Sequence, residues 1–186
     1  VGDNQSQGKG RTAGNLVGGD YEVGGSYGGT GGRWYNTNSN HVPQPVYGGF
    51  DSITGPGSGG GSEFNYCPNS DVGGNGGGWV RITADAVFID GEVTADGLMV
   101  PTTGTSNGGG GSGGAIEIDV DSISGTGTVH ANGADQAGSN SNAGGGGRVA
   151  LFYTQVDGFD LDSLSAHSGS VAPNSGNEYK AAGGAG

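Results

Sequence analysis

Four aspartates in the middle of the chain have spacings that could bring carboxylate oxygens together, and they are Asp85, Asp90, Asp119 and Asp121. A pair of carboxylates is the catalytic unit of most glycosidases. A polysaccharide lyase would be expected to place a basic residue among such carboxylates, yet Arg81 and Arg148 are the only cations between residues 79 and 169. We therefore interpret the four aspartates as solvated positions on strand faces, and we expect the chain not to be an enzyme.

Other motifs that resemble catalytic or binding sites have no supporting context. Residues 55–60 match Gly-x-Gly-x-x-Gly, but 47 of the 186 residues are glycine, so the match is expected by chance, and no strand-to-helix transition surrounds it. No serine lies in the strand-to-helix turn of a nucleophile elbow. Cys67 is the single cysteine and the three histidines are far apart, so a zinc spacing is missing. A disulfide from Cys67 to a second chain and glycosylation of Asn4, in the sequon Asn-Gln-Ser, stay open.

The charge of the chain excludes one class of partner. Six Lys and Arg residues stand against eighteen Asp and Glu residues, a formal net charge of −12. Nucleic acid is therefore not expected as a partner, because phosphate contacts need a basic patch. No apolar run approaches the ~18 residues of a membrane span. The chain begins at Val1 without a signal-like segment, and we expect a processed product or a piece of a longer protein.

The elements that must position the aspartates form a repeat. The stretches Trp79–Gly97 and Ala115–Gly133 align without a gap at an offset of 36 residues, and a third copy starts at Arg148, 33 residues after Ala115. Each copy follows a Gly/Asn/Ser-rich tract. A fixed period of this size is typical of solenoids, whose units bury their apolar faces by stacking. We expect one domain over residues 1–186, with a glycine- and aromatic-rich part at 1–72 and the three repeats at 73–186.

Apolar parity within each copy predicts strands. Ile116, Ile118 and Val120 alternate with acidic residues, and the parity then flips before Ile123. We place a corner near Asp121 that separates two short strands facing one core. No stretch keeps helical apolar spacing over ten residues without a glycine. The fold class we predict is all-β, with parallel β-solenoid-like strands and no helix.

The glycine tracts allow two interpretations. Flexible linkers are the common role of Gly/Ser runs. Tracts that return at matching points of every repeat are instead consistent with ordered extended segments of polyproline-II geometry, whose backbones approach closely because side chains are missing. We expect such polyglycine-II-type segments in at least part of the chain, above all in its N-terminal part.

Stacking the first two copies in register predicts a cation site. Arg81 then lies beside Glu117 and Thr83 beside Asp119, whereas Asp85 lies beside Asp121. Two carboxylates directly opposite each other on adjacent strands are destabilising unless solvent screens them or a cation neutralises them. Calcium collects carboxylates with carbonyls and water. The candidate metal ligands are Asp85 and Asp121, with help from Asp90, and screening by solvent is the alternative.

The third copy predicts an interface. Its outward positions hold Ala150 and Phe152, where the other copies hold charged or hydroxyl residues, so both faces of this strand are apolar. An apolar outward face is normally covered. We expect the N-terminal half or another subunit to bury Phe152.

The order of Gly tract, Gly-Gly strand, GTGTVHANGAD, a second Gly tract and GGGGRVALFY resembles the glycine-rich repetitive modules of very large secreted or surface proteins of prokaryotes. The resemblance covers residues 73–186, and the N-terminal third only by composition. It implies stalks, adhesin segments or surface-layer material at an extracellular or cell-surface location, and it supplies no active-site residues.

The function we expect is a structural module of an extracellular fibre, surface layer or large adhesin. Its partners would be copies of itself or other modules of a longer chain, because no polar capping segment follows the third repeat. A carbohydrate-binding module is the first alternative, with a stacking platform of Trp34, Tyr35, Tyr47, Phe50 and Tyr66, although we favour the interpretation that these rings fill a core poor in apolar residues. An ice-binding protein, with Thr126 and Thr128 on a flat face, is the second.

Overall fold

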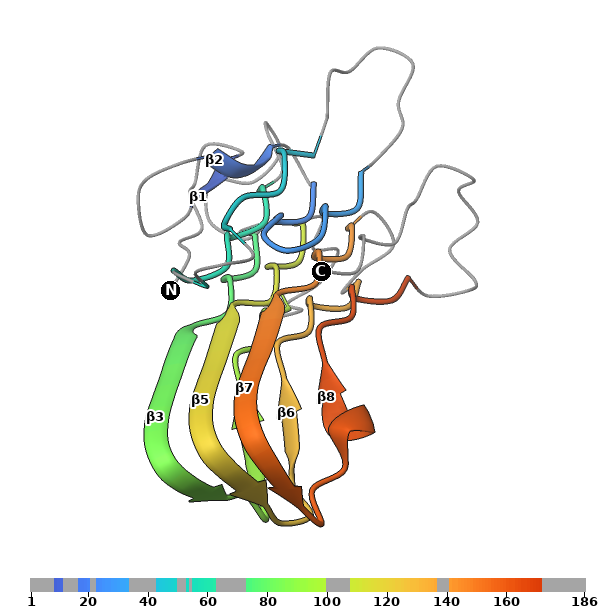
Figure 1. Cartoon of the computed structure of the whole chain (residues 1–186). Helices are drawn as coiled ribbons and strands as arrows, with labels where there is room; N and C mark the ends of the chain where they lie inside the picture. Colours follow the sequence, from blue (N-terminus) through green and yellow to red (C-terminus); the bar gives the residue numbers. More distant parts are fainter. Residues whose placement is uncertain are drawn as a thin grey trace.

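Three long strands lie side by side in a parallel sheet, in the order β3-β5-β7, in the computed structural model of the chain (Figure 1). The structure describes residues 9–11, 17–20, 23–33, 43–49, 53, 55–62, 73–99, 108–136 and 141–171. The long strands are β3 (Trp79–Phe88), β5 (Ala115–Ser124) and β7 (Arg148–Asp157). Trp79 pairs with Ala115, and Ala115 with Arg148, so the offsets of 36 and 33 residues read from the sequence are confirmed as the strand register.

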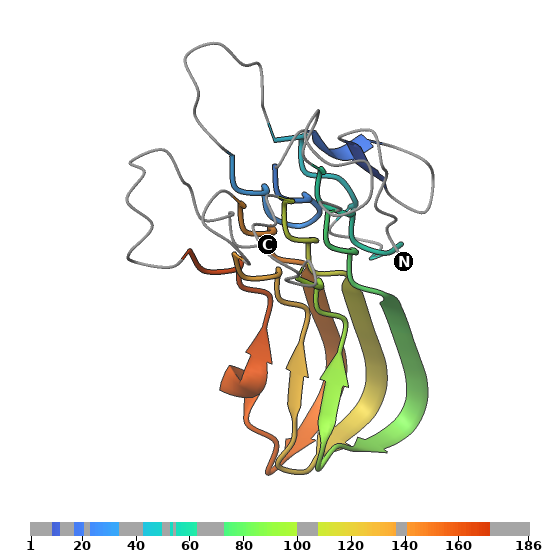
Figure 2. The same ribbon diagram turned by 180° about the vertical axis from the view of Figure 1, so that it is seen from behind.

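Each long strand reverses and returns as a short strand in a second parallel sheet, in the order β4-β6-β8 (Figure 2). These strands are β4 (Glu92–Thr94), β6 (Thr128–His130) and β8 (Leu164–Ser165), and the 3-10 turn η1 (Leu161–Ser163) precedes the last. We call each long strand with its returning partner a rung: rung 1 is β3 and β4, rung 2 is β5 and β6, and rung 3 is β7, η1 and β8. Within the described residues the fold is all-β with no α-helix, as predicted, and no helix there could cross a membrane.

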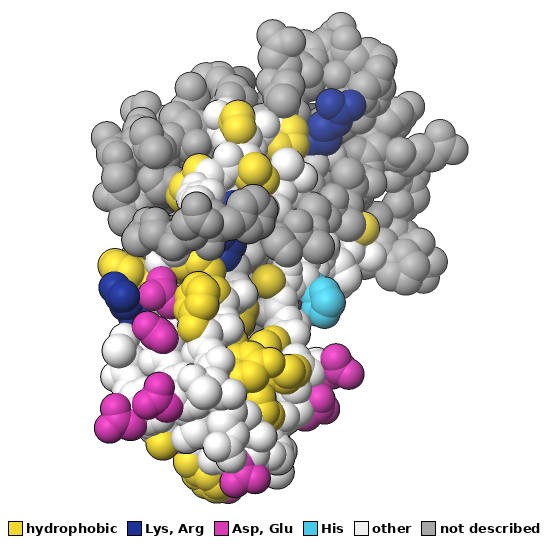
Figure 3. Space-filling view, in the orientation of Figure 1, with side chains coloured by type: hydrophobic (Ala, Val, Ile, Leu, Met, Phe, Trp, Pro, Cys, Tyr) yellow, Lys and Arg dark blue, Asp and Glu magenta, His cyan; other side chains and the backbone are white. Residues whose placement is uncertain are grey.

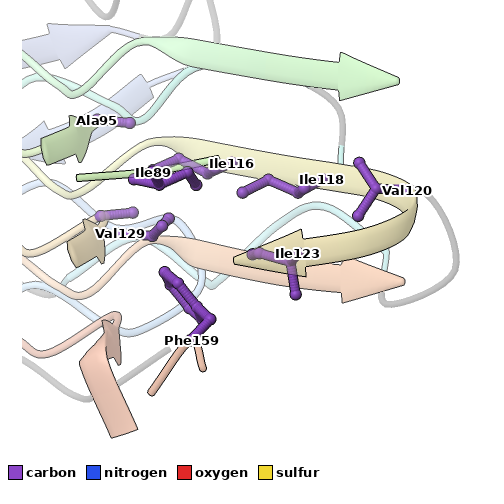
Figure 4. Close-up of a cluster of buried hydrophobic side chains, with 9 residues drawn as sticks. Ile89, Ala95, Ile116, Ile118, Val120, Ile123, Val129 and Phe159 are labelled. Atoms are coloured by element: carbon purple, nitrogen blue, oxygen red, sulfur yellow. The ribbon is translucent and has the colours of Figure 1, made fainter. Parts of the chain in front are cut away.

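The core lies between the two sheets and is complete only in the middle rung. Ile116, Ile118, Ile123 and Val129 are all 0% exposed, and Figure 4 shows them pointing into the space between the sheets. Phe159 closes the cluster from rung 3. The equivalent residues of the outer rungs are only partly buried: Val80, Ile82, Val87 and Val93 in rung 1, and Val149, Leu151, Val156 and Leu164 in rung 3.

The predicted corner near Asp121 is a bend within one strand. Strand pairing continues on both sides of Asp121, from Val120 to Ser122, so β5 is a single curved strand and not two short ones. The parity flip is real, because Val120 and Ile123 are both buried. The chain reverses further on, at Gly125, whose φ of 108° lies in the left-handed region that favours glycine.

The N-terminal part contains a short antiparallel sheet that the sequence reasoning missed. Strands β1 (Lys9–Arg11) and β2 (Val17–Asp20) pair there, with an irregular register. Neither strand shows apolar alternation over more than a few residues, so no periodic signal marks them.

The glycine tracts are joined by backbone hydrogen bonds, and segment 108–114 shows the pattern most completely. Every third amide of this segment donates to the same neighbour. The acceptor segments are 55–62 for Gly109 and Ser112, 141–147 for Gly110 and Gly113, and 95–98 for Gly111 and Gly114, with N···O distances of 2.7–3.2 Å.

The carbonyls of segment 108–114 bond to three further segments. The carbonyls of residues 109–112 accept amide hydrogens from residues in 73–78, 23–33 and 131–134, and the carbonyl of Gly114 accepts from Arg148 where β7 begins. The segment therefore has six hydrogen-bonded neighbours in all. Such close approach needs missing side chains, since a Cβ on Gly114 would overlap the carbonyl oxygen of Gly78, and a Cβ on Gly111 that of Asn75.

Buried serine hydroxyls connect three of these segments. Ser112 Oγ accepts from the amide of Ser58 at 2.8 Å, and Ser58 Oγ donates to the carbonyl of Ser26 at 2.6 Å. Ser26 Oγ in turn accepts from the amide of Gly31 at 2.9 Å. Each of the three serines is 0% exposed, so water cannot bond their hydroxyls, and the hydrogen bonds to neighbouring glycine-rich segments take its place.

Candidate functional site: the open rung stack and its polar ladder

The sequence-predicted cross-strand pairs form between rungs 1 and 2. Arg81 Nε lies 3.1 Å from Glu117 Oε1, and Thr83 pairs with Asp119. The register places Asp85 beside Asp121, since the residues on either side of each are paired. The Arg81 side chain is 58% exposed, so this ion pair contributes at most about 1 kcal/mol to stability.

The structure does not bring Asp90 to Asp85 and Asp121. Asp90 Oδ1 accepts hydrogen bonds from the amide of Thr126 at 3.1 Å and from its hydroxyl at 3.2 Å. Across the described ranges, which include all three aspartates, no group of three or more Asp, Glu, His or Cys is arranged to hold a metal ion. Calcium binding at the Asp85 and Asp121 pair stays a prediction.

Asp90 is instead one of several side chains that accept the backbone amide of the next rung. Asp96 Oδ1 accepts from the amide of Asn132 at 2.6 Å, and Asn132 Oδ1 accepts from the amide of His167 at 2.8 Å. Asp135 Oδ1 does the same for Ser170 at 2.7 Å. These contacts form a polar ladder, in which a side chain of one rung bonds the amide of the equivalent residue, 35 or 36 positions later.

Two further contacts fix the ladder side chains. His130 Nδ1 lies 2.9 Å from Asp96 Oδ2, and Ser165 Oγ donates to Asn132 Oδ1 at 3.1 Å. Sequence reasoning missed this ladder. The signal was present, because Asp96 and Asn132 each precede a glycine at the same place in the repeat.

A groove of about 380 Å³ runs beside the ladder. Its lining consists of Asp96, Gly97, Met99, Asn132, Gly133, Ala134, Asp135, His167 and Ser168, so the segments that follow β4, β6 and β8 all contribute. The groove offers amide, carboxylate and imidazole groups next to one thioether side chain, a mixture that can hydrogen-bond a neutral polar ligand.

Tyr47 is the one member of the proposed aromatic platform within the described residues. Its ring lies 4.8 Å from that of Tyr27, and its hydroxyl donates to the carbonyl of Pro56 at 2.8 Å. Burial, reinforced by Tyr27, raises the pKa of Tyr47 well above its usual range. Tyr47 therefore packs inward. Trp34, Tyr35, Phe50 and Tyr66 lie outside the described residues, as do Cys67 and Asn4.

The N-terminal part covers Ala150 but leaves Phe152 exposed. Ala150 packs against the cluster of Tyr27, Ile53 and Ala115, on the outer face of the long-strand sheet. Phe152 is 50% exposed, so the prediction that the N-terminal half buries it is not met. The N-terminal residues that pack on this face contact Ala115 and Ala150, near the start of the long strands. Burial of Phe152 by another subunit stays a prediction.

Arg148 holds the N-terminal part to the sheet. It is 8% exposed, its Nη2 donates to the carbonyls of Tyr47 and Gly48 at 3.3 and 3.2 Å, and its guanidinium lies 5.7 Å from the Tyr27 ring centroid. The sequence reasoning counted Arg148 only as one of the few cations. Its place at the end of a glycine tract, on an outward strand position, is the signal that it could have used.

Both ends of the rung stack are open among the described residues. Each of the strands β3, β4, β7 and β8 has a neighbour on one side only. At the inward-facing positions of the long strands, the residues of β5 are buried and those of β3 and β7 are not: Val120 is 5% exposed, whereas Ala84 and Tyr153 on either side of it are both exposed. Figure 3 shows hydrophobic side chains at the surface beside β7, where rung 3 ends the stack.

Comparisons with known proteins give no relative for this chain. No family model matches it, and neither a curated protein nor a solved structure is significantly similar to it.

Proposed function

We propose that this chain is a structural module of an extracellular fibre, surface layer or large adhesin. In this proposal the rungs form a β-solenoid and the glycine segments form a bundle of polyglycine II. The observation that carries the proposal is segment 108–114, in which every third amide donates to the same one of three neighbouring segments, while its carbonyls accept from further segments. Polyproline-II geometry has three residues per turn, so each turn would direct one amide toward each of three neighbours.

Such a bundle suits a structural role because backbone hydrogen bonds hold it together. Glycine loses more conformational entropy on folding than any other residue, and a glycine bundle offsets that loss only through many satisfied backbone groups. The rungs add an apolar core below it, with Ile116, Ile118 and Ile123 fully buried. The hydrogen-bonded glycine bundle and the apolar core of the rungs each hold part of the module together. This favours the role of a rigid scaffold over that of a hinge or lid.

The acidic composition supports the extracellular part of the proposal. A net charge of −12 keeps copies soluble until specific contacts form. The resemblance to glycine-rich modules of prokaryotic surface proteins points to the same location.

Immunogold electron microscopy of the source cells tests this function. Antibodies against the purified chain are expected to label fibres, sheets or the outer surface, and pre-absorption with the chain should remove the label. Label confined to the cell interior would contradict the proposal.

A carbohydrate-binding module is the second candidate, now supported by the groove and not by the aromatic set. The ladder contacts hold the side-chain amide of Asn132 and the side-chain carboxylate of Asp135 in place. Neither side chain therefore needs to be ordered when a hydroxyl-rich ligand binds. Calorimetric titration with a panel of neutral polysaccharides tests it. Asn132→Asp keeps the acceptor oxygens but removes the amide donor, and it should weaken any binding at the groove.

A further inference from the structure

We infer that rung 3 of one copy binds rung 1 of a second copy, head to tail, and extends both sheets in the same parallel register. This inference rests on the proposed structural role and names the partner as a second copy of this chain. The surface is formed by the outer edges of β7 and β8 in one copy and of β3 and β4 in the other.

The chain already forms this contact twice, between rungs 1 and 2 and between rungs 2 and 3. Both contacts are parallel and in register, with Val80 beside Ile116 and Ile116 beside Val149. The inferred contact repeats the same step, so Val149 would lie beside Val80 of the second copy. Leu151 would likewise meet Ile82, and Val156 would meet Val87. All of these side chains are only partly buried in a single copy, and the contact would complete their burial.

The exposed apolar side chains support this choice of surface. Tyr153 on rung 3 is 45% exposed and Leu161 in η1 is 40% exposed, whereas Val120 at the position of Tyr153 in the middle rung is 5% exposed. A further rung beside rung 3 would therefore bury Tyr153 as rungs 1 and 3 bury Val120. Large exposed apolar side chains on unpaired strand edges are typical of interaction sites.

Charges are compatible with the inferred register. Asp85 lies beside Asp121 within one copy, but at the new contact it would lie beside Thr154, which carries no charge. Arg81 would lie beside Ala150, and Thr83 beside Phe152. No like charges are opposed on the outward face of the long strands, so the contact avoids the repulsion present inside the chain.

The polar ladder also has a direction that favours head-to-tail contact. Asp96 accepts the amide of Asn132, and Asn132 accepts the amide of His167. His167 takes the same ladder position on rung 3, and a ring nitrogen of neutral histidine is an acceptor. It would receive the amide of Asp96 from the second copy. A heterologous contact of this kind leaves a free end at each step, so copies would add into an open filament.

Cysteine cross-linking tests the register in a Cys67→Ser background. Thr83→Cys and Phe152→Cys are made in separate chains, which are mixed and oxidised. Residues in register on adjacent strands lie about 4.8 Å apart, within the Cα range of roughly 4.4–6.8 Å for a disulfide. The mixture should give a cross-linked dimer. Positions 83 and 152 of one chain are two strand spacings apart, roughly 9.6 Å, which is too far for a disulfide within the chain. A chain with both substitutions should therefore give a series of longer cross-linked products.

Two controls identify the contact. Thr83→Cys mixed with Thr154→Cys is two residues out of register and should give little dimer. Either single variant alone should give no disulfide-linked dimer, because the inferred contact places position 83 beside position 152 and not beside itself. Cross-linking of a single variant alone would show a symmetric contact and overturn the inference, and so would equal yields in the matched and shifted mixtures.

Size measurement in solution separates this inference from the proposed function. Sedimentation at micromolar concentration should show association that rises with concentration, and Ile82→Lys, which puts a charge on the open end of the core, should abolish it. The outward control Thr83→Lys should associate. A wild-type chain that stays an 18.0 kDa monomer at every concentration would overturn the inference, while surface label in the source cells would leave the structural function standing.

Discussion

Gly78 and Gly114 occupy equivalent positions, each directly before a long strand, yet their surroundings differ. A Cβ on Gly114 would overlap the carbonyl oxygen of Gly78, whereas a Cβ on Gly78 would meet nothing within 4 Å. We expect Gly114→Ala to lower the free energy of unfolding by about 3 kcal/mol or more, because the neighbouring backbone must move apart. Denaturant unfolding of the two alanine variants measures the difference.

Gly78→Ala is the matched control and should be neutral or slightly stabilising, since alanine restricts the unfolded chain. Equal losses in the two variants would mean that strand entry, and not the close approach, sets the cost.

Tyr47 gives a prediction at alkaline pH. Burial raises the pKa of Tyr47 and of its neighbour Tyr27 above the ordinary value of 10.0. Above about pH 10 the unfolded chain loses these protons while the folded chain keeps them, so stability falls as pH rises. Tyr47→Phe removes the bond to Pro56 and should cost about 1 kcal/mol at pH 7, but it should make the loss above pH 10 shallower.

Urea unfolding between pH 7 and 11 measures this dependence. A wild type and a Tyr47→Phe variant with parallel pH profiles would contradict the assignment of the alkaline loss to Tyr47.

The ladder makes the stacking of elements depend on single acceptor oxygens. Asn132 Oδ1 accepts from the amide of His167 and from the hydroxyl of Ser165. Asn132→Ala would leave both donors without this acceptor, and we expect a loss of about 1–3 kcal/mol. Asn132→Asp should restore most of the lost stability, because an aspartate at the equivalent position of rung 1, Asp96, already accepts the backbone amide of the next rung. Thermal melting of the three proteins gives the comparison, and an aspartate variant as unstable as the alanine variant would argue against the ladder.

Two measurements on the carboxylate pair of Asp85 on β3 and Asp121 on β5 distinguish solvent screening from calcium binding. If solvent alone screens Asp85 and Asp121, Asp121→Asn should raise stability by about 0.2–1 kcal/mol in low salt, and the gain should vanish at high salt. If calcium binds, excess calcium should raise the melting temperature of the wild type and a chelator should lower it. Wild-type curves that coincide with and without calcium would remove the cation site.

The repeat could be predicted from sequence because strand periodicity and register are local signals. Val80, Ile116 and Val149 stand at matching places, and the structure pairs them. The corner near Asp121 was placed at a real bend but was wrongly interpreted as a break between two strands, because a parity flip does not show whether the chain reverses or only bends. Gly125, with its positive φ, makes the reversal, and in a chain with so many glycines it does not stand out.

At the level of the whole molecule, the sequence indicated that glycine tracts are ordered but could not show which tracts meet. Segment 108–114 bonds to residues as far as 85 positions earlier, at Gly25, and 34 positions later, at Arg148, and one glycine tract resembles another. Arg148 shows the same limit, because its partners Tyr47 and Gly48 lie about a hundred positions earlier.

Phe152 distinguishes folding from assembly. Because its side chain is half exposed in a single copy, Phe152→Asn, which adds no charge beside Asp119, should lower the free energy of unfolding of a dilute sample by no more than about 0.5 kcal/mol. The same variant should associate less, since Phe152 would lie in the contact with the second copy. Melting and sedimentation of one preparation measure both effects. Strong destabilisation of the dilute protein would show that Phe152 is buried within the chain, contrary to its exposure.

The rotation of three in segment 108–114 has a consequence for how such chains can vary in length. Inserting one or two residues into the segment would turn every later amide toward the wrong neighbour. It would also move residues with side chains into positions where only glycine fits against the neighbouring backbone. In the proposed polyproline-II geometry, inserting three would add one full turn and return every later amide to the same neighbouring segment. Natural variants of this module should therefore gain or lose glycine-tract residues in triplets, which correspond to nine nucleotides of coding DNA, while loops between tracts vary by any number.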